Sequence, residues 1–280
     1  SLISFIRFLS PNNCVLLYHY CLEVKMDYNY LQLGINNHIA TITLNRPSIL
    51  NALSANLTSE LHQALDEISF NNNVWVVILT GSGRGFCSGA DVSEWGKPDR
   101  PVPTRPLVEL GLHIRDIPQP VIAGINGIAA GAGLTIAIST DIRIASSDAR
   151  FSSIFVKRSI VLDTGASYLL PKLVGPGVAS EMSLTGNVYD ADWALRVGLV
   201  NKVVSPEHLM TEVDSMAQAL LSNPPLAVQS IKKIMNSQDP DLNKIIKMEL
   251  QATDLLRKTQ DSVEAVNAFK EKRLPIYTGF

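Results

Sequence analysis

Hydrophobic and polar residues follow two different periods in the first part of the chain. The segment 38–45 (HIATITLN) alternates with the period of two that is typical of a half-buried strand, and Pro47 ends it. The segment 54–70 has helical spacing instead, with apolar residues on one face at Leu57, Leu61, Leu65 and Ile68. Ser54 is a suitable N-cap for this helix. We therefore predict a strand followed by a helix.

Two further apolar runs, 74–80 (VWVVILT) and 120–125 (PVIAGI), each lead into a glycine-rich turn. Both runs are continuously apolar and rich in β-branched residues, as strands are in a sheet that is covered on both faces. A helix is expected around 106–116, another from about residue 131, and a strand at 141–146 (DIRIAS). The repeated strand and helix units predict an α/β fold with a largely parallel sheet.

The glycine-rich turns themselves, 83–91 (GRGFCSGAD) and 127–133 (GIAAGAG), point to chemistry. Glycine lacks the Cβ that would keep a ligand away from the backbone, so each turn could present backbone N–H donors. Paired N–H donors suit an oxygen that gains negative charge during a reaction. The turns therefore predict a pocket that polarises a carbonyl group. Residues 96–106 contain four prolines and are predicted to form a surface loop near its mouth.

The strand pattern mostly fades after about residue 190, and helical spacing takes over in segments 206–222, 225–237 and 241–272. The last segment has these apolar positions: Ile245, Ile246, Leu250, Leu255, Val263, Val266 and Phe269. We predict a helical C-terminal region that packs on its own domain and has enough apolar surface for oligomerisation.

The composition fits one large domain, or a domain with a helical appendage, since 280 residues with 46% apolar and 18% charged side chains can bury a sizeable core. The net charge of −2 gives no long-range attraction to nucleic acid or to an anionic membrane, so neither is an expected partner. Cys14, Cys21 and Cys87 are odd in number and lack metal-type spacing, which indicates neither a disulfide framework nor a zinc site. A reducing, cytoplasmic location is expected.

The first 25 residues are apolar, but Arg7 and Pro11 interrupt them before the roughly 20 residues that a membrane span needs. They lack an initiating Met and a small-residue cleavage site, whereas Met26 opens a well-patterned segment. We expect residues 1–25 to be a non-native extension outside the core, and the native chain to start at Met26. A mitochondrial transit segment is the alternative, because Arg7 is basic and no acidic residue precedes Glu23.

Two other interpretations of the first glycine-rich turn are not favoured. GSGRGF has Phe86 where a dinucleotide-binding fingerprint needs its third glycine, and no Gly-Lys-Ser/Thr follows as in a P-loop. GFCSG has the form of a nucleophile elbow, which would make Cys87 a nucleophile. That role needs a later histidine, and only His113 and His208 follow, so we favour Cys87 as a small buried residue.

Six longer motifs stand in a fixed order: ITLNRPSILNALS, VVILTGSGRGFCSGADV, PVIAGINGIAAGAGLTIAISTDIRIASSDARF, LLPKLVG, SLTGNVYDADWALRVGLVNKVV and FKEKRLPIYTGF. Together they resemble the crotonase (enoyl-CoA hydratase/isomerase) family over nearly everything after Met26. The resemblance implies a crotonase-type spiral of ββα turns in a core domain at 26–205. It also implies a C-terminal helical region at 206–280 that builds a homotrimer or a dimer of trimers.

The resemblance also implies the ligand and the site. The substrate would be an acyl-CoA thioester, with coenzyme A as part of the substrate and no separate cofactor or metal. The backbone N–H groups of Ala90 and Ala132 would polarise the thioester carbonyl. The CoA path would be lined by Ser48, Ile49, Leu50, Ser88, Asp91 and Val92, and the acyl pocket by Gly131, Thr135 and Phe155. Core packing for Leu50 and Val92, and an N-cap role for Asp91, are the alternatives.

The chain departs from the family pattern at two of these positions. Family hydratases carry catalytic glutamates at the positions of Thr135 and Phe155, and neither residue here can deprotonate water. Ordinary hydration of an enoyl-CoA is therefore disfavoured. Phe155 in place of a glutamate also suggests a drier acyl pocket that accepts aryl groups.

Asp163 is the candidate acid and base, at a position where family hydratases usually have glycine. The surrounding run resembles dienoyl-CoA isomerases, 1,2-epoxyphenylacetyl-CoA isomerases and 4-chlorobenzoyl-CoA dehalogenases, although the helical histidine of the dehalogenases falls near Val108. Apolar neighbours such as Phe155 would desolvate the carboxylate and make it a better base near neutral pH. The alternative for Asp163 is a helix N-cap. His113 and Glu94 are weighed as second acid or base groups, with solvated helix faces as their favoured positions.

These observations predict an acyl-CoA enzyme of fatty-acid metabolism, with double-bond or ring isomerisation as the favoured reaction. Asp163 would move a proton between carbons, because the enolate is delocalised and no water need be activated. The first alternative is an enoyl-CoA hydratase, which is a lyase, or an aryl-CoA dehalogenase or hydrolase in which Asp163 holds water or attacks the acyl group. The second is a catalytically silent CoA-ester binder, or an RNA-binding relative, which the charge balance disfavours.

Overall fold

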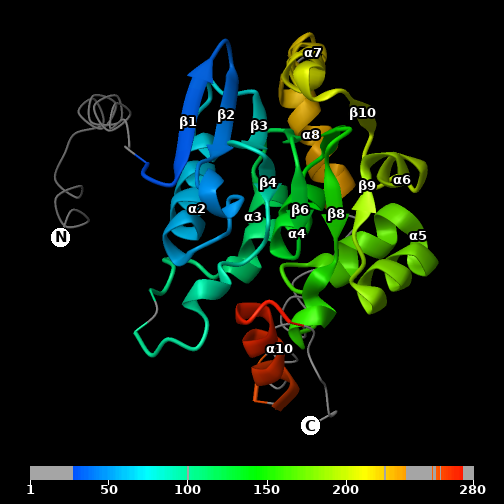
Figure 1. Cartoon of the computed structure of the whole chain (residues 1–280). Helices are drawn as coiled ribbons and strands as arrows, with labels where there is room; N and C mark the ends of the chain where they lie inside the picture. The colour runs from blue at the N-terminus through cyan, green and yellow to red at the C-terminus, as the bar shows by residue number, and fades with distance from the viewer. Residues whose placement is uncertain are drawn as a thin grey trace, which may run out of the picture.

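Two β-sheets form the frame of the molecule, shown as a computed structural model in Figure 1. The structure describes residues 28–99, 101–223, 225–237, 254, 257–258 and 260–273. The larger sheet has the order β1 (Leu31–Asn36), β2 (Ile39–Leu44), β3 (Val76–Gly81), β5 (Val121–Ile125), β7 (Ile142–Ser146) and β10 (Lys202–Val204). The smaller sheet has the order β4 (Gly85–Cys87), β6 (Ile128–Ala130), β8 (Arg150–Ser152) and β9 (Tyr189–Asp190). Neighbouring strands run parallel except in the antiparallel pairs β1–β2 and β8–β9.

Consecutive strands divide between the two sheets and are then followed by a helix. β3 and β4 precede α3 (Leu110–Asp116), β5 and β6 precede α4 (Ala132–Ile138), and β7 and β8 precede α5 (Ala166–Thr185). In each pair the first strand joins the larger sheet and the second joins the smaller sheet. This repeat confirms the predicted α/β spiral of ββα turns.

The remaining described helices lie before, between and after these units. The α-helices are α2 (Ala55–Ser69), α6 (Ala191–Arg196), α7 (Leu209–Leu221), α8 (Pro225–Ser237) and α10 (Gln260–Lys270). The short 3-10 helices are η4 (Pro47–Ile49), η5 (Val92–Glu94), η6 (Leu107–Glu109), η7 (Ile154–Arg158) and η8 (Pro206–His208). In the part of the chain that the structure describes, none of the helices has the length and apolar character needed to cross a membrane.

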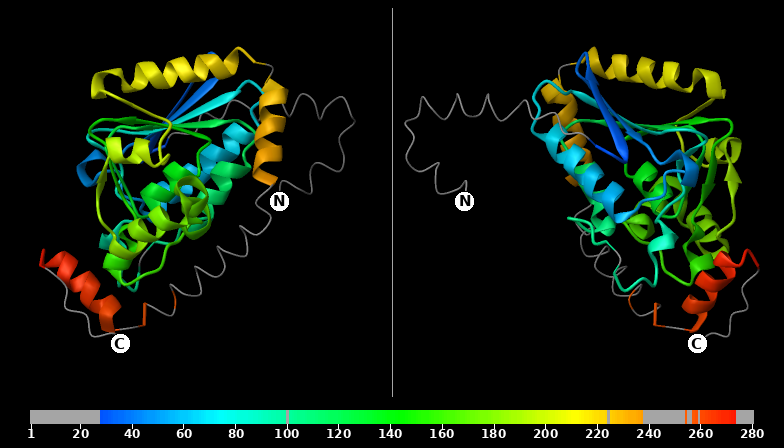
Figure 2. Two further views of the ribbon diagram at one scale, coloured as in Figure 1. Left: turned by 90° about the vertical axis from the view of Figure 1, so that its right-hand side faces the viewer. Right: turned by 60° about the vertical axis from the view of Figure 1, so that its left-hand side comes forward.

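Both faces of the larger sheet are covered, as its continuously apolar strands require (Figure 2). Successive residues of β3 point to opposite faces. Val77 packs with Leu61 of α2 in the larger core, whereas Ile78 packs with Val213 of α7 in a second core on the other face. The sheet is therefore a rigid support for the loops at its strand ends.

Most of the predicted elements are confirmed, but several observed elements were not predicted, among them β1 with six residues and α5 with twenty. β2, β5 and β7 lie in three of the predicted strands, and β3 matches the fourth but ends one residue later, at Gly81. The Ser54 hydroxyl accepts the Leu57 N–H (3.2 Å) as the N-cap of α2. The strands β4 and β6 lie inside segments that we predicted as glycine-rich turns, and β10 lies where the strand pattern fades. Each has three residues, which is too few for a period to be recognised.

The C-terminal prediction is confirmed in part. α7 and α8 lie in the predicted segments 206–222 and 225–237, and α10 contains Val263, Val266 and Phe269 of the third. Four predicted apolar positions lie outside the described residues: Ile245, Ile246, Leu250 and Leu255. The extension 1–25 and the start at Met26 also lie outside them. The domain boundary at residue 205 stays a prediction.

Candidate functional site

The two glycine-rich segments lie against each other. A Cβ on Gly89 would be 2.8 Å from the Ala130 oxygen and 3.5 Å from the Ala132 nitrogen. A Cβ on Gly133 would overlap the Cys87 carbonyl group. Only glycine permits these close approaches, so the sequence brings the end of β4 next to the first turn of α4.

Ala90 follows Gly89 in a short parallel bridge to Leu53. The Leu53 N–H donates to the Gly89 oxygen (2.8 Å), and the Asp91 N–H donates to the Leu53 oxygen (3.0 Å). Because backbone groups alternate in direction along an extended chain, the N–H of Ala90 points away from Leu53. Within the described residues it donates to no protein acceptor.

Ala132 is the first residue of α4, so its N–H has no acceptor inside the helix. Gly131 before it has φ 53° and ψ −127° and donates its own N–H to the Ser152 oxygen (3.0 Å). No protein acceptor for the Ala132 N–H is found among the described residues. We call the N–H groups of Ala90 and Ala132 the donor pair. The packing of Gly89 on Ala132 brings the two predicted residues together.

The two positions where hydratases have glutamates hold no titratable group. Thr135 is fully buried in α4 and donates its hydroxyl to the Gly131 oxygen (3.3 Å). Phe155 is buried in η7, and a ring carbon lies 3.9 Å from where a Cβ on Gly131 would stand. The wall beside the donor pair is therefore apolar.

The predicted CoA path is partly assembled at the surface. Ser88 donates its hydroxyl to the Ile49 oxygen (3.2 Å) and its N–H to the Leu50 oxygen (2.9 Å), so these three residues lie together. Ser48 and Ile49 are exposed and Leu50 is partly buried, with φ 54°. Val92 is partly buried in η5. The binding roles of these residues stay predictions.

Asp91 has a structural role of its own. Its carboxylate caps η5 by accepting the Ser93 N–H (3.1 Å), which confirms the alternative that we gave for it. It also accepts the Ser93 hydroxyl (2.7 Å) and forms an ion pair with Arg46 (2.9 Å). Burial alone would raise the pKa of this carboxyl, but the hydrogen bonds from Ser93 and Arg46 outweigh burial and lower the pKa. The carboxylate is thus held by protein groups.

Asp163 begins a tight, partly buried turn, residues 163–165, which we call the Asp163 turn. Its Oδ1 accepts the Thr164 hydroxyl (2.9 Å). Thr164 is buried with φ 59°, a left-handed conformation that costs a β-branched residue about 1–3 kcal/mol. The N-cap of α5 is Gly165, so the alternative that Asp163 is the N-cap is wrong. Strain at a buried turn is typical of functional positions.

The Asp163 turn packs against α3 through Gly111. A Cβ on Gly111 would overlap the Thr164 carbonyl oxygen and lie 2.8 Å from the Ser139 hydroxyl. α5, which follows the turn, contacts both α4 and η7. The helix that continues from the turn is therefore packed on the two elements that carry Ala132 and Phe155. Sequence reasoning missed Gly111, because a single glycine in a helix gives no signal of its contact.

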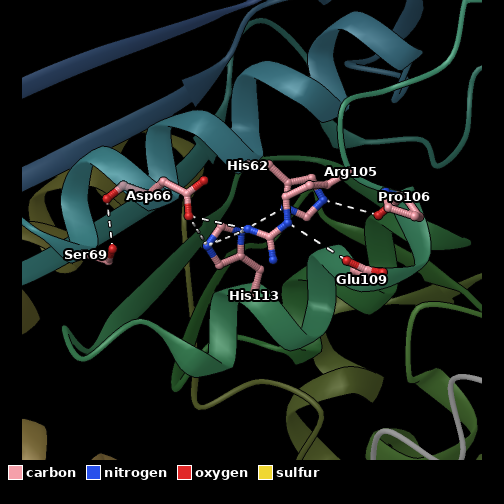
Figure 3. A network of polar contacts seen from close by, with 7 residues as sticks. All are labelled: His62, Asp66, Ser69, Arg105, Pro106, Glu109 and His113. Carbon is pink, nitrogen blue, oxygen red and sulfur yellow. Dashed lines mark hydrogen bonds and ion pairs between the residues drawn. The ribbon is translucent and has the colours of Figure 1, made fainter. Parts of the chain in front are cut away.

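His113 is not on a solvated helix face, and that prediction is wrong. The residue is 7% exposed, and its Nδ1 lies 2.8 Å from Nδ1 of His62 (Figure 3). Its Nε2 lies 3.1 Å from the Asp66 carboxylate, and Arg105 of the proline-rich loop contacts both His113 (3.2 Å) and Asp66 (3.4 Å). This network holds the end of the loop on α2 and α3. The Glu94 side chain lies outside what the structure describes.

Burial also controls the ionisation of His62 and of Cys87. It lowers the pKa of His62 to about 4, so the imidazole is neutral at neutral pH. It raises the pKa of the Cys87 thiol to about 12, and Cys87 is fully buried. The nucleophile-elbow interpretation is therefore wrong, and the favoured interpretation of Cys87 as a small buried residue is confirmed.

The comparisons with known proteins agree in family but not in reaction. The family model for enoyl-CoA hydratase/isomerase matches residues 34–279. Over 254 residues the chain is 39% identical to the short-chain-enoyl-CoA hydratase of Clostridium acetobutylicum, covering 89% of this chain and 97% of that protein. Over 258 residues it is 33% identical to the 1,2-epoxyphenylacetyl-CoA isomerase of Escherichia coli, covering 88% and 97%. A solved enoyl-CoA hydratase from Mycobacterium avium subsp. paratuberculosis superposes with a TM-score of 0.82 at 32% identity, covering 90% of this chain and all of that one.

Proposed function

Because the chain belongs to the enoyl-CoA hydratase/isomerase family, we propose that it isomerises a double bond or a ring in an acyl-CoA thioester, with Asp163 as the proton carrier. The observation that carries this proposal is the distribution of titratable groups. Thr135 and Phe155 supply none beside the donor pair, whereas the partly buried Asp163 turn has a carboxylate next to the strained, buried Thr164. A single carboxylate is enough for isomerisation.

The reaction would begin with the thioester carbonyl oxygen accepting hydrogen bonds from Ala90 and Ala132. Two fixed donors stabilise the negative charge that develops when a proton leaves the neighbouring carbon. Asp163 would take that proton and return it to another carbon of the delocalised enolate. This chemistry needs no metal or redox group, and coenzyme A enters as part of the substrate.

The names of the similar proteins support two candidate reactions. The isomerase of Escherichia coli, at 33% identity, acts on 1,2-epoxyphenylacetyl-CoA by its name, which fits an apolar wall formed by Phe155. The hydratase of Clostridium acetobutylicum is more similar, at 39%, and makes hydration the second candidate. Hydration here would require Asp163 to activate water without either hydratase glutamate, so we favour isomerisation.

The test follows both reactions on the same protein. We expect the wild-type chain to convert 3-enoyl-CoA thioesters, from short alkyl to aryl, into conjugated 2-enoyl products with a rise in absorbance. Asp163→Asn is expected to lose about 10²–10⁴ of the rate, the usual contribution of a general acid or base, and to keep its affinity for CoA esters. Asp148→Asn, an exposed aspartate in the turn before β8, is the matched control and should keep the full rate.

Other outcomes would select the alternatives. Loss of absorbance from a 2-enoyl-CoA without turnover of any 3-enoyl-CoA would identify a hydratase. A covalent adduct on Asp163, seen by mass spectrometry, would identify the other enzymes. An aryl ester formed from a halogenated aryl-CoA with release of halide would identify a dehalogenase, and a mixed anhydride formed with release of coenzyme A would identify a hydrolase. Binding of CoA esters without any turnover would identify a silent binder. The homotrimer or dimer of trimers and the cytoplasmic location stay predictions that this test does not address.

A further inference from the structure

We propose that Arg46 and Asp91 form a positioning pair that holds the Ala90 N–H in the direction needed to polarise the thioester carbonyl. The proposal rests on the oxyanion part of the proposed function and is independent of Asp163. It gives Asp91 a role different from contact with coenzyme A. Its basis is the way in which the neighbours of Ala90 are held.

Ala90 is held through the residues on both of its sides. The backbone bonds from Leu53 and Asp91 fix one side of the short bridge, as described above. The side chain of Asp91 is held as well, because its carboxylate accepts from Nη1 of the Arg46 guanidinium (2.9 Å). The same Nη1 donates to the Ala52 oxygen (2.6 Å). Arg46 thus ties residue 52, beside Leu53, to residue 91, beside Ala90, and this contact fixes the two partners of the bridge together.

The same unit also holds the strand that leads to Ala90. The Arg46 N–H donates to Oδ1 of Asn51 (2.8 Å), which is fully buried with φ 56°. The Asn51 side-chain amide donates in turn to the Gly85 oxygen (2.8 Å) and the Phe86 oxygen (3.1 Å) of β4. Both ends of the segment from β4 to residue 91 therefore depend on residues of the loop after β2.

Charge and burial explain why an ion pair is used at this position. The two side chains are 19% and 9% exposed, so their attraction is little screened by water. Arg46 also neutralises a carboxylate that stands one residue from Ala90. Without Arg46 that negative charge would oppose the negative charge developing on the thioester oxygen. The Arg46–Asp91 pair therefore sets the direction of the Ala90 N–H and also the electrostatic field around it.

The test measures carbonyl polarisation directly. A conjugated aryl-acyl-CoA thioester, whose absorption band moves to longer wavelength when its carbonyl is polarised, is bound to wild type, Arg46→Met and Asp91→Asn. We expect wild type to give the red shift and Arg46→Met to lose most of it. Its kcat should fall about 10²-fold, the usual effect of losing one preorganised donor, with little change in Kd for the thioester. Asp91→Asn should lose less, because an amide oxygen can still accept from Arg46.

A second buried ion pair provides the matched control. Lys232 of α8 is 5% exposed and pairs with Asp141 (3.0 Å), so Lys232→Met also removes a buried cation. It should lower the unfolding temperature and leave the red shift intact. If Arg46→Met does not fold, the double variant Arg46→Met/Asp91→Asn removes both charges, and it should still lose the shift.

The results separate this inference from the proposed function. A folded Arg46→Met or double variant with the full red shift would overturn the positioning role. A wild-type protein that binds the thioester without any red shift would overturn the oxyanion role of Ala90 and Ala132, and the positioning role with it. Asp163→Asn should keep the shift, so an inactive Asp163→Asn does not bear on Arg46.

Discussion

The donor pair and the Asp163 turn are built by different means. The Ala90 and Ala132 donors belong to the backbone, and their directions are set by a bridge to Leu53 and by the start of α4. The group that we propose to react at Asp163 is a side chain, on a turn whose shape depends on the left-handed Thr164 and on a glycine in α3. Backbone donors tolerate changes of side chain, whereas a side-chain acid can be lost or gained by one substitution. The relatives of this chain include both a hydratase and an isomerase by name, as expected if the side-chain acid changes while the backbone donors stay.

Beyond the Asp163→Asn variant, the largest expected effect comes from removing one donor of the donor pair. Ala132→Pro deletes an N–H that has no acceptor in α4, and proline is well tolerated at the first helical position. We expect about 10²–10³ loss in kcat, together with loss of the red shift of a bound conjugated thioester. Ala55→Pro, at the first position of α2, is the control and should keep the shift. Full activity of a folded Ala132→Pro would remove Ala132 from the donor pair.

An intermediate effect is expected when only the Asp163 turn is moved. Gly111→Ala places a Cβ against the Thr164 carbonyl, and such overpacking costs about 1–3 kcal/mol of stability. We expect the isomerisation rate to fall about tenfold, which is about 1.4 kcal/mol in the barrier, while the red shift remains. Gly177→Ala in α5 is the control, because a Cβ there meets nothing within 4 Å. Loss of both rate and red shift in Gly111→Ala would show that the two regions are not independent.

The smallest effect is expected from the face of α3 that carries His113. This face lies opposite Gly111, because residues 111 and 113 point about 200° apart on a helix. Burial lowers the pKa values of His62 and His113 below 6.5, so the unfolded chain binds more protons than the folded one below that pH. Stability should be constant above about pH 7 and fall towards pH 4, by at most about 1.4 kcal/mol per pH unit for each proton. His62→Gln should flatten this dependence in denaturant titrations. Identical slopes in the two proteins would contradict the assignment to His62.

Asp66, Arg105 and Glu109 are the charged groups that face this histidine pair. Asp66 favours protonation of His113 and Arg105 opposes it. Because burial is the largest cause for both histidines, we expect the direction of the pH dependence to persist in Asp66→Asn. The red shift, which reports on the donor pair, and the isomerisation rate, which reports on Asp163, should both change only in proportion to the folded fraction.

Local patterns account for what could be predicted from the sequence. The Ser54 cap, the strands with continuous apolar runs and the start of a helix at Ala132 each depend on residues that are close in the chain. The glycines of the two turns were predicted to let a ligand approach the backbone, which stays a prediction, and in the structure Gly89 and Gly133 also let the two turns pack closely together. Such features are determined by residues within a few positions of each other.

Contacts between distant residues account for what was missed. His62 and His113 are 51 residues apart, and neither lies in a pattern that announces the other. Arg46 and Gly111 likewise depend on partners, Asp91 and Thr164, that only the fold brings near. His113 was therefore predicted to be solvated, as a histidine in a short helix usually is. Side-chain burial depends on packing that no local period describes.

In the proposed isomerisation, the carboxylate of Asp163 carries the proton from one carbon to another. The most direct measurement uses a 3-enoyl-CoA with two deuterium atoms on the carbon next to the thioester, and follows the label in the 2-enoyl product by mass spectrometry and NMR. We predict that a measurable fraction of the deuterium reappears at the carbon that gains a hydrogen, and that Asp163→Asn abolishes both this transfer and the reaction. Rapid isomerisation with hydrogen delivered only from solvent, or label transfer that survives in Asp163→Asn, would contradict the account.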